Sequence, residues 1–233
     1  MTEWGYDLFT VAYPELRELA FQVLSMHAEV NELGIDKLKL WRYVNEVASR
    51  YHERPFHNLR HAVDVLLATS CLMRFLQRAH PEPFKDPLTV TALLLSAFVH
   101  DVDHPGVMNS FLIATSHPLA VLYNFKSVLE NHHAATAVAL MQRPELDFLG
   151  GLERVRRVAF IQALQGNVLA TDVTTTMPAI KAFSATVSGG EVPSTEMVRS
   201  PSSKRERQGG CTARRGARDS RNGRAHSPPV TGA

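Results

Sequence analysis

The sequence predicts an all-α fold, and three observations support this prediction. Apolar residues recur at the three- and four-residue spacing of amphipathic helices in several stretches of the chain. Asp or Pro stands where several of these stretches begin, as is typical of helix N-termini. The alternation of apolar and polar residues that marks a half-buried strand is missing, and the β-branched run Val173-Thr-Thr-Thr176 stands alone. With 45% hydrophobic and 21% charged residues, the chain has the composition of a globular protein.

Three helices are predicted in the N-terminal part. The first begins near Pro14, and its apolar face is formed by Leu16, Leu19, Ala20, Val23 and Leu24. Asp36 can cap the second helix, whose apolar face holds Leu40, Trp41, Val44, Val47 and Ala48. The third helix is expected from about Asn58 to Leu76.

Three further helices are predicted along the rest of the domain. One starts at Asp86-Pro87, where Asp can cap the helix and Pro fits the first helical position. Its residues 88–98 are apolar nearly all round, so this helix should lie at the centre of the domain. The other two are expected over residues 127–141 and 152–169. No internal repeat is found.

Charge is distributed unevenly along the chain. The formal net charge is +2, but residues 184–233 hold nine Lys and Arg and four Asp and Glu, which leaves 16 basic and 19 acidic residues in 1–183. Residues 184–233 contain no Phe, Trp or Tyr and are rich in Gly, Ser, Pro and Arg. Such a segment cannot bury enough apolar surface to offset the entropy of ordering. We therefore predict a folded domain over 1–183 and a disordered basic tail over 184–233, with no specific nucleic-acid partner.

Composition also disfavours several classes of protein. No apolar run reaches the ~20 residues of a membrane helix, and the first residues lack the basic and apolar regions of a secretory signal. The two cysteines, Cys71 and Cys211, are too few for a disulfide framework or a thiolate zinc site. We expect a cytoplasmic protein without a transmembrane segment.

Histidine is the unusual component of this sequence. Nine of the 11 histidines lie within residues 52–133. His57 and His61 are four residues apart, so they project from one face of a helix. His100 and His104 repeat that spacing directly after the apolar helix over 88–98.

Imidazole and carboxylate side chains in such a cluster suit zinc, iron, manganese or magnesium. Asp101 follows His100 directly, and a carboxylate in this place can bridge two metals. Two metals about 3.5–4 Å apart would clamp a phosphate and generate hydroxide at neutral pH. A single histidine is more often a surface or satisfied core residue. That interpretation is preferred for His27, His52, His80, His117 and His226.

Four motifs in this region resemble those of the class I cyclic-nucleotide phosphodiesterases. They are Tyr51-His-Glu-Arg-Pro-Phe-His-Asn-Leu-Arg-His-Ala-Val-Asp-Val65, His100-Asp-x-x-His-x-x-x-x-Asn109, Ser127-Val-Leu-Glu-Asn-His-His133 and Leu169-Ala-Thr-Asp172. Their order and intervals match, which makes the resemblance specific. It implies an all-helical, HD-type catalytic domain that hydrolyses cyclic AMP or cyclic GMP to the 5′-monophosphate.

The resemblance also implies roles for individual residues. His57 is similar to the general acid that protonates the departing ribose O3′. His61 and His100 resemble ligands of a first metal, usually zinc. Asp101 resembles the carboxylate shared with a second metal, usually magnesium, for which manganese is an alternative. A cyclic phosphodiester has a poor alkoxide leaving group, so a proton donor on one side and hydroxide on the other suit its hydrolysis.

Further residues are implied around these. His104, Glu130 and Thr171 are similar to residues that hold metal-bound waters. Asp172 matches the family pattern but is not counted as a metal ligand. Asp64 can orient a ligand imidazole, which metal-bound histidine usually requires.

Some of these residues have a second interpretation. Ser127 and Glu130 form an S-x-x-E capping box, so Glu130 can instead satisfy N–H groups at a helix start, and the two interpretations are equally supported. His132 and His133 point about a hundred degrees apart on a helix, so at most one faces the site. Asn109 can simply turn the backbone.

The resemblance covers residues 9–183. No segment in 184–233 resembles the family's later metal-binding Asp or its purine-binding Gln, so we expect a truncated catalytic domain that is weak or inactive. Apolar faces near 87–98 and 128–142 would then be left open to water, and such an exposed patch predicts association with another copy or a partner. Two alternatives remain. One is another HD-type metal phosphohydrolase, which the presence of His57 disfavours. The other is a non-enzymatic half-domain that binds a partner.

Overall fold

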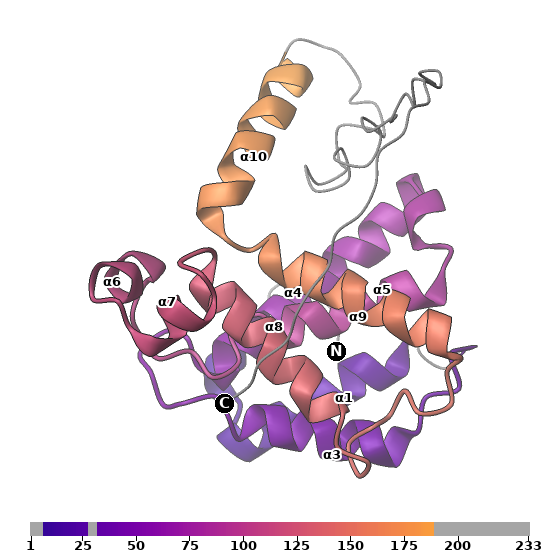
Figure 1. The fold of residues 1–233 in the computed structure, drawn as a ribbon. Coiled ribbons are helices and arrows are strands. Elements are labelled where there is room, and N and C mark those ends of the chain that lie inside the picture. The colour runs from indigo at the N-terminus through magenta and orange to yellow at the C-terminus, as the bar shows by residue number, and fades with distance from the viewer. Residues whose placement is uncertain (1–6, 28–31, 189–233) are drawn as a thin grey trace, which may run out of the picture. The chain divides into compact units, whose positions relative to one another are not determined.

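The computed structural model describes residues 7–27 and 32–188 of the chain. Within these ranges the protein is helical and contains no strand, which confirms the predicted fold class. Two short 3-10 helices in these ranges are η1 (Leu8–Thr10) and η2 (Glu82–Phe84). The α-helices (Figure 1) are α1 (Tyr13–Met26), α3 (Lys37–Ala48), α4 (Leu59–Ala79), α5 (Pro87–Val99), α6 (Asn109–Ala114), α7 (Pro118–Leu122), α8 (Val128–Met141), α9 (Arg154–Leu169) and α10 (Val173–Ser188).

The helix starts predicted at the caps Asp36 and Asp86, and the start expected near Asn58, are confirmed. The Asp36 carboxylate accepts two backbone N–H groups in the first turn of α3. Asn58 Oδ1 accepts the N–H of His61 in the first turn of α4. Asp86 likewise caps α5. These bonds satisfy donors that have no partner inside their helix, and the cap at Asn58 fixes the turn that carries His61.

Helix α5 lies at the centre of the domain, as its apolar sequence predicts. It packs against α4 and α9, while α8 packs on α9 and α1 packs on α3 and α4 (Figure 1). Leu94, Leu95 and Phe98 of α5 are fully buried. The Tyr51 hydroxyl donates to the carbonyl of Phe98 over 2.8 Å. The carboxyl end of α5 is therefore tied to the segment that precedes α4.

The sequence does not predict α6, α7 or α10. Helices α6 and α7 have six and five residues, too few to show helical periodicity. Helix α10 begins in the β-branched run at Val173, where the Asp172 side chain accepts the N–H of Thr174. This cap outweighs the modest strand preference of β-branched residues.

The chain divides into two units between Ala182 and Phe183, within α10. Every feature described below belongs to the first unit. Helix α10 extends to Ser188, and the rest of the predicted tail, 189–233, lies outside the described residues. The division into a domain over 1–183 and a disordered tail stays a prediction. None of the described helices is both long and apolar enough to cross a membrane.

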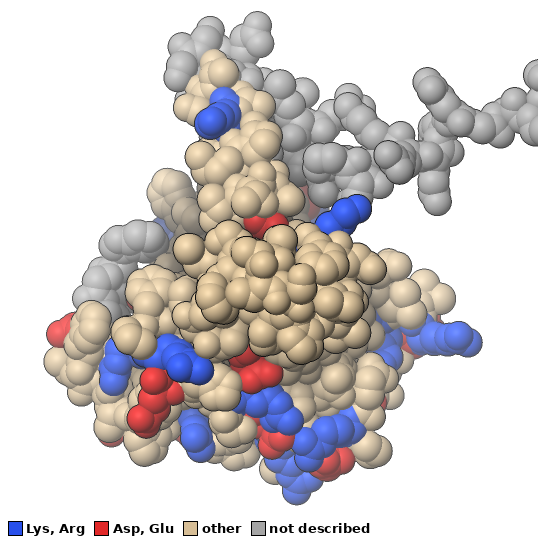
Figure 2. Space-filling view, turned by 60° about the vertical axis from the view of Figure 1, so that its left-hand side comes forward, with Lys and Arg blue, Asp and Glu red and all other residues tan. Residues whose placement is uncertain are grey.

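The exposed apolar side chains include a group that was not predicted: Met108, Phe111, Val121, Leu122 and Phe125. The segment from His104 to Phe125 contains no Lys, Arg, Asp or Glu. The face turned forward in Figure 2 carries α6 and α7, and it is uncharged over a broad central area. The prediction that the faces near 87–98 and 128–142 are open to water is wrong, because most apolar residues of α5 and α8 are buried.

Candidate metal centre

A cavity of about 730 Å³ opens beside the carboxyl end of α5. Its wall combines segments far apart in the sequence: the loop before α4, the end of α5, α8 and the end of α9. Several titratable or hydroxyl-bearing residues of the four motifs line this cavity: His57, His100, Asp101, His104, Glu130, His133, Thr171 and Asp172. Helix packing thus brings together residues that the sequence separates by more than a hundred positions.

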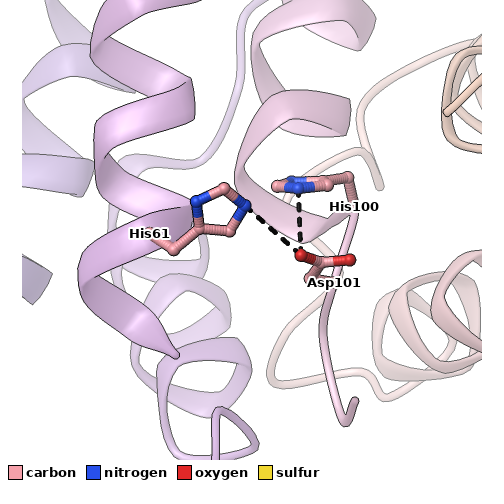
Figure 3. A group of neighbouring side chains, drawn as sticks. All are labelled: His61, His100 and Asp101. Carbon is pink, nitrogen blue, oxygen red and sulfur yellow. Dashed lines mark ion pairs between the residues drawn. The ribbon is translucent and has the colours of Figure 1, made fainter. Parts of the chain in front are cut away.

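His61, His100 and Asp101 form a compact group (Figure 3). His61 Nε2 lies 3.4 Å from Asp101 Oδ2, and His100 Nε2 lies 3.2 Å from the same oxygen. One ligand atom of each residue lies within 4.8 Å of the others. His61 stands in the first turn of α4, and the other two residues follow α5. The packing of α4 against α5 therefore assembles the group.

The protonation of His100 is set by its backbone contact. His100 Nδ1 lies 3.0 Å from the carbonyl of Ala97, and a carbonyl only accepts, so Nδ1 carries the hydrogen. In the neutral ring, the Nε2 lone pair then faces the carboxylate of Asp101. Two acceptors facing each other at 3.2 Å require a proton or a cation between them. This donor set fits a divalent metal ion that takes imidazole and carboxylate ligands.

Electrostatics in the group favour an ionised Asp101. Burial alone would raise the pKa of Asp101, but hydrogen bonds from His100 and His61 outweigh it and hold that pKa far below its usual range. Burial would lower the pKa of His100, but the bond to Asp101 outweighs this and raises it. The site is thus built to hold positive charge beside one carboxylate.

A second group of possible ligands shares the same carboxylate. One ligand atom each from Asp101, His104 and His133 lies within 4.8 Å of the others. His133 donates Nδ1–H to the carbonyl of Val102 over 2.7 Å, and its Nε2 lies 3.8 Å from Asp101 Oδ1. Burial lowers the pKa of His133 to about 3, so its ring is neutral. Asp101 therefore lies between two sets of imidazoles.

His133 is a site residue that the sequence does not single out. One of the pair His132 and His133 faces the cavity, as the helical spacing predicts, and it is His133. A usable signal was present, because His133 stands three residues after Glu130 and so shares its face of α8. His132 points elsewhere and pairs with Asp103.

His57 lies at the cavity wall with its ring stacked on that of His104. The ring centroids are 3.9 Å apart and the planes are inclined by 8°. Burial and the neighbouring charge of His57 lower the pKa of His104 to about 4. The N–H of Gly106 donates to His104 Nδ1 over 2.9 Å. Gly106 adopts a φ of +84°, and the side chain of Arg54 lies against it, so a larger residue there would be strained.

Glu130 is held by a residue that the sequence analysis treated as a simple turn. Asn109 Nδ2 donates to Glu130 Oε2 over 2.9 Å, and Asn109 Oδ1 accepts the N–H of Leu129 over 2.9 Å. Asn109 therefore caps α8 from outside the helix. The capping box is wrong, because Ser127 adopts a φ of +40° and donates its hydroxyl to Asp172 instead. Burial raises the pKa of Glu130.

Thr171 and Asp172 close the cavity from the end of α9. The Thr171 hydroxyl donates to the carbonyl of Val168 over 2.7 Å, which orients its oxygen. Asp172 is buried and accepts the hydroxyls of Ser127 and Thr174, each over 2.6 Å. Burial would raise the pKa of Asp172, but these hydrogen bonds outweigh it and lower the pKa. That Asp172 is not a metal ligand stays a prediction.

Asp64 does not lie beside a ligand imidazole, contrary to what the sequence predicts. It lies on an exposed part of α4, and the His61 ring pairs with Asp101 instead. The interpretation that Asp64 orients a ligand imidazole is wrong. For His100, the carbonyl of Ala97 provides that contact.

Comparison with known proteins gives a consistent result. The 3′5′-cyclic nucleotide phosphodiesterase family matches residues 56–210. The probable 3′,5′-cyclic-AMP phosphodiesterase pde-4 of Caenorhabditis elegans is 35% identical over 177 residues, which cover 74% of this chain and 26% of that protein. The 3′,5′-cyclic-AMP phosphodiesterase 4C of Rattus norvegicus is 36% identical over 176 residues, covering 73% of this chain and 32% of that protein. This chain thus spans about a quarter to a third of the length of these curated relatives.

Solved structures show the same likeness. The phosphodiesterase domain of the RhoPDE fusion protein from the choanoflagellate Salpingoeca rosetta superposes with a TM-score of 0.74 and 27% sequence identity. The match covers 82% of this chain and 59% of that domain. The helical fold of this chain is therefore shared with a solved phosphodiesterase domain.

Proposed function

Because the chain belongs to the 3′5′-cyclic nucleotide phosphodiesterase family, we propose that it hydrolyses a 3′,5′-cyclic nucleotide to the 5′-monophosphate. Cyclic AMP is the proposed substrate, since the relatives described above are named as cyclic-AMP phosphodiesterases, and cyclic GMP is the alternative. The observation that carries the proposal is that His57, His100 and Asp101 line one cavity, with His61 grouped beside Asp101 as a further possible ligand.

Two divalent metal ions are part of the proposal. His61, His100 and Asp101 would hold the first, proposed to be zinc, because they offer two imidazole nitrogens and a carboxylate oxygen within ligand reach. Asp101 would be shared with the second, proposed to be magnesium or manganese. When bound, such a pair of ions supplies charge for the phosphate and makes water a nucleophile at neutral pH.

His57 is proposed as the general acid. The ribose oxygen that leaves a cyclic phosphodiester is a strongly basic alkoxide, so it departs readily only when protonated. His57 lines the cavity, and its stacking partner His104 is kept neutral by burial and by the charge of His57. His57 is therefore placed to donate a proton to O3′ of a substrate in the cavity.

His104, Glu130 and Thr171 are proposed to orient water within the cavity. Each presents a polar atom there, and each is fixed by a contact of its own: Gly106 holds His104, Asn109 holds Glu130, and the carbonyl of Val168 holds Thr171. A raised pKa makes Glu130 a better proton acceptor than an ordinary exposed carboxylate.

Activity of the 233-residue chain by itself is proposed to be weak, since it covers 59% of the solved phosphodiesterase domain described above. The test is hydrolysis of cyclic AMP and cyclic GMP by the purified chain supplied with zinc and magnesium, beside a His61→Ala variant. Measurable turnover that His61→Ala abolishes supports the proposed function. Turnover that is insensitive to this substitution, or cleavage of other phosphoesters alone, would contradict it.

A further inference from the structure

Asp103 uses both carboxylate oxygens to join three segments of the domain. His52 Nε2 lies 2.9 Å from Asp103 Oδ1, and His132 Nε2 lies 2.8 Å from Asp103 Oδ2. His52 precedes α4, Asp103 follows α5, and His132 stands on α8. None of the three lines the cavity or belongs to either group of possible metal ligands. The proposed reaction therefore uses none of these three side chains.

The segment that carries Asp103 is held by side-chain contacts at two successive residues, Val102 and Asp103. Asp103 adopts a left-handed φ of 60°, which few residues other than glycine tolerate. The preceding carbonyl, of Val102, accepts the Nδ1–H of His133. Two neighbouring histidines of α8 therefore hold two neighbouring residues of the segment that also contains Asp101. Asp101 directly precedes these two anchored residues.

The other partner, His52, belongs to the segment that carries His57. The carbonyl of His52 accepts the N–H of Arg54 over 2.8 Å, and the carbonyl of Arg54 accepts Asn58 Nδ2 over 2.8 Å. Asn58 in turn caps α4 through the N–H of His61. Residues 52–58 are thus anchored at one end by Asp103 and at the other by α4, with His57 between the anchors.

We propose that Asp103 is a positioning residue, whose bridge between His52 and His132 holds the loop of His57 in register with Asp101. This inference rests on the proposed function, in which His57 donates a proton and Asp101 belongs to the metal site. Breaking the bridge frees one end of the loop at His52 and leaves the ligands His61, His100 and Asp101 in place. Proton delivery is then impaired more than metal binding.

Two substrates with different leaving groups can distinguish misplacement of His57 from damage to the whole site. A ribose alkoxide must be protonated as it leaves, whereas 4-nitrophenolate leaves without help from an acid. Misplacement of His57 therefore slows hydrolysis of a cyclic nucleotide but not of bis(4-nitrophenyl) phosphate. Damage to the whole site slows both.

The experiment compares four forms of the full chain: wild type, His52→Ala, His52→Gln and the matched control His80→Ala. His52 and His80 are both exposed, so the substitutions leave the core intact. With zinc and magnesium present, His52→Ala should lower kcat for cyclic AMP about tenfold. The KM for cyclic AMP should stay within about twofold of wild type. The rate of hydrolysis of bis(4-nitrophenyl) phosphate should also stay within about twofold of wild type. His52→Gln keeps a side-chain N–H for Asp103 and should restore most of kcat. His80→Ala should match wild type.

Equal loss on both substrates, or no loss on either, would overturn the proposal. Failure of the wild-type chain to cleave either substrate is a failure of the proposed function, and a second measurement then decides the inference. In the metal-free chain, the ring NMR signal of His57 should shift in His52→Ala and Asp103→Asn but not in His80→Ala. An unchanged His57 signal in the first two variants would refute the positioning role.

Discussion

The rings of His57 and His104 lie one on the other, with centroids 3.9 Å apart and planes inclined by 8°. Two imidazolium ions at this separation repel each other strongly, so only one of the rings can readily be charged. Burial and the charge of His57 lower the pKa of His104 to about 4. The stacked arrangement therefore keeps His104 neutral beside His57.

Replacement of His57 should remove the acid and spare the metal site. We expect His57→Gln to lower kcat for cyclic AMP by about 10²- to 10⁴-fold, the usual contribution of general acid catalysis. Zinc bound per chain should stay unchanged, because His57 is outside both groups of possible ligands. Steady-state hydrolysis and metal analysis measure the two effects, with His80→Gln as the control. Loss of zinc in His57→Gln would instead identify it as a ligand.

His61→Ala should weaken zinc binding by more than about a hundredfold, since even outer-sphere partners of a metal typically contribute 10- to 100-fold. Competition with a chelator measures this affinity. Asp64→Ala is a matched control, because Asp64 is an exposed residue one turn along α4 from His61. Equal affinity of wild type and His61→Ala would show that the metal is held elsewhere.

The stability of the metal-free chain should depend on pH through His133. Burial lowers its pKa from 6.5 to about 3 in the folded state. Between these values the unfolded chain binds more protons at this site, so its contribution to stability is complete above pH 6.5 and is lost as the pH falls. Each pH unit in this window removes about 1.4 kcal/mol.

His133→Gln removes this titration. The difference in free energy of unfolding between wild type and His133→Gln should therefore shrink by about 3 kcal/mol from pH 7 to pH 4. Urea denaturation in the presence of a chelator measures it, and His80→Gln should track wild type at each pH. A difference that does not vary with pH would mean that His133 is not buried in its neutral form.

Asn109 should stabilise α8 through the contact that it makes from outside the helix. Asn109→Ala removes the acceptor for the N–H of Leu129 and the donor to Glu130, and we expect a loss of about 1–2 kcal/mol in the free energy of unfolding. Asn109→Asp keeps the acceptor but sets a second carboxylate against Glu130, so it should raise the pKa of Glu130 further. Urea denaturation and NMR titration measure these effects. Ser110→Ala, on the exposed side of α6, should change stability by less than about 0.5 kcal/mol.

The central position of α5 predicts a large effect of truncating its side chains. Leu94 is fully buried, and Leu94→Ala should lower the free energy of unfolding by about 2–5 kcal/mol through lost burial and a residual cavity. Leu72 on α4 is 51% exposed, so Leu72→Ala should cost less than about 1 kcal/mol. Thermal or urea unfolding of both variants provides the measurement. Similar losses for both would contradict the central placement of α5.

The sequence alone was sufficient to identify the helices with a long apolar face and a capping residue. Asp36 and Asp86 mark helix starts because each cap is a local contact within a few residues. The grouping of His61, His100 and Asp101 was also predictable, because a resemblance in four ordered motifs implied it. Helices α6, α7 and α10 were missed, since they are too short or too rich in β-branched residues to show a periodic pattern.

Contacts between distant segments could not be derived from the sequence. Ser127 and Glu130 fit a local capping box, yet Asn109 takes the capping position because α6 packs beside the start of α8. His52 and Asp103 looked unremarkable, and they are joined only because the end of α5 lies against the loop before α4. Local patterns therefore determined the longer helices, and the resemblance implied the candidate metal ligands. The packing of α4, α5 and α8 decided which of those side chains meet, because side-chain pairing across helices depends on tertiary geometry that no spacing along one helix encodes.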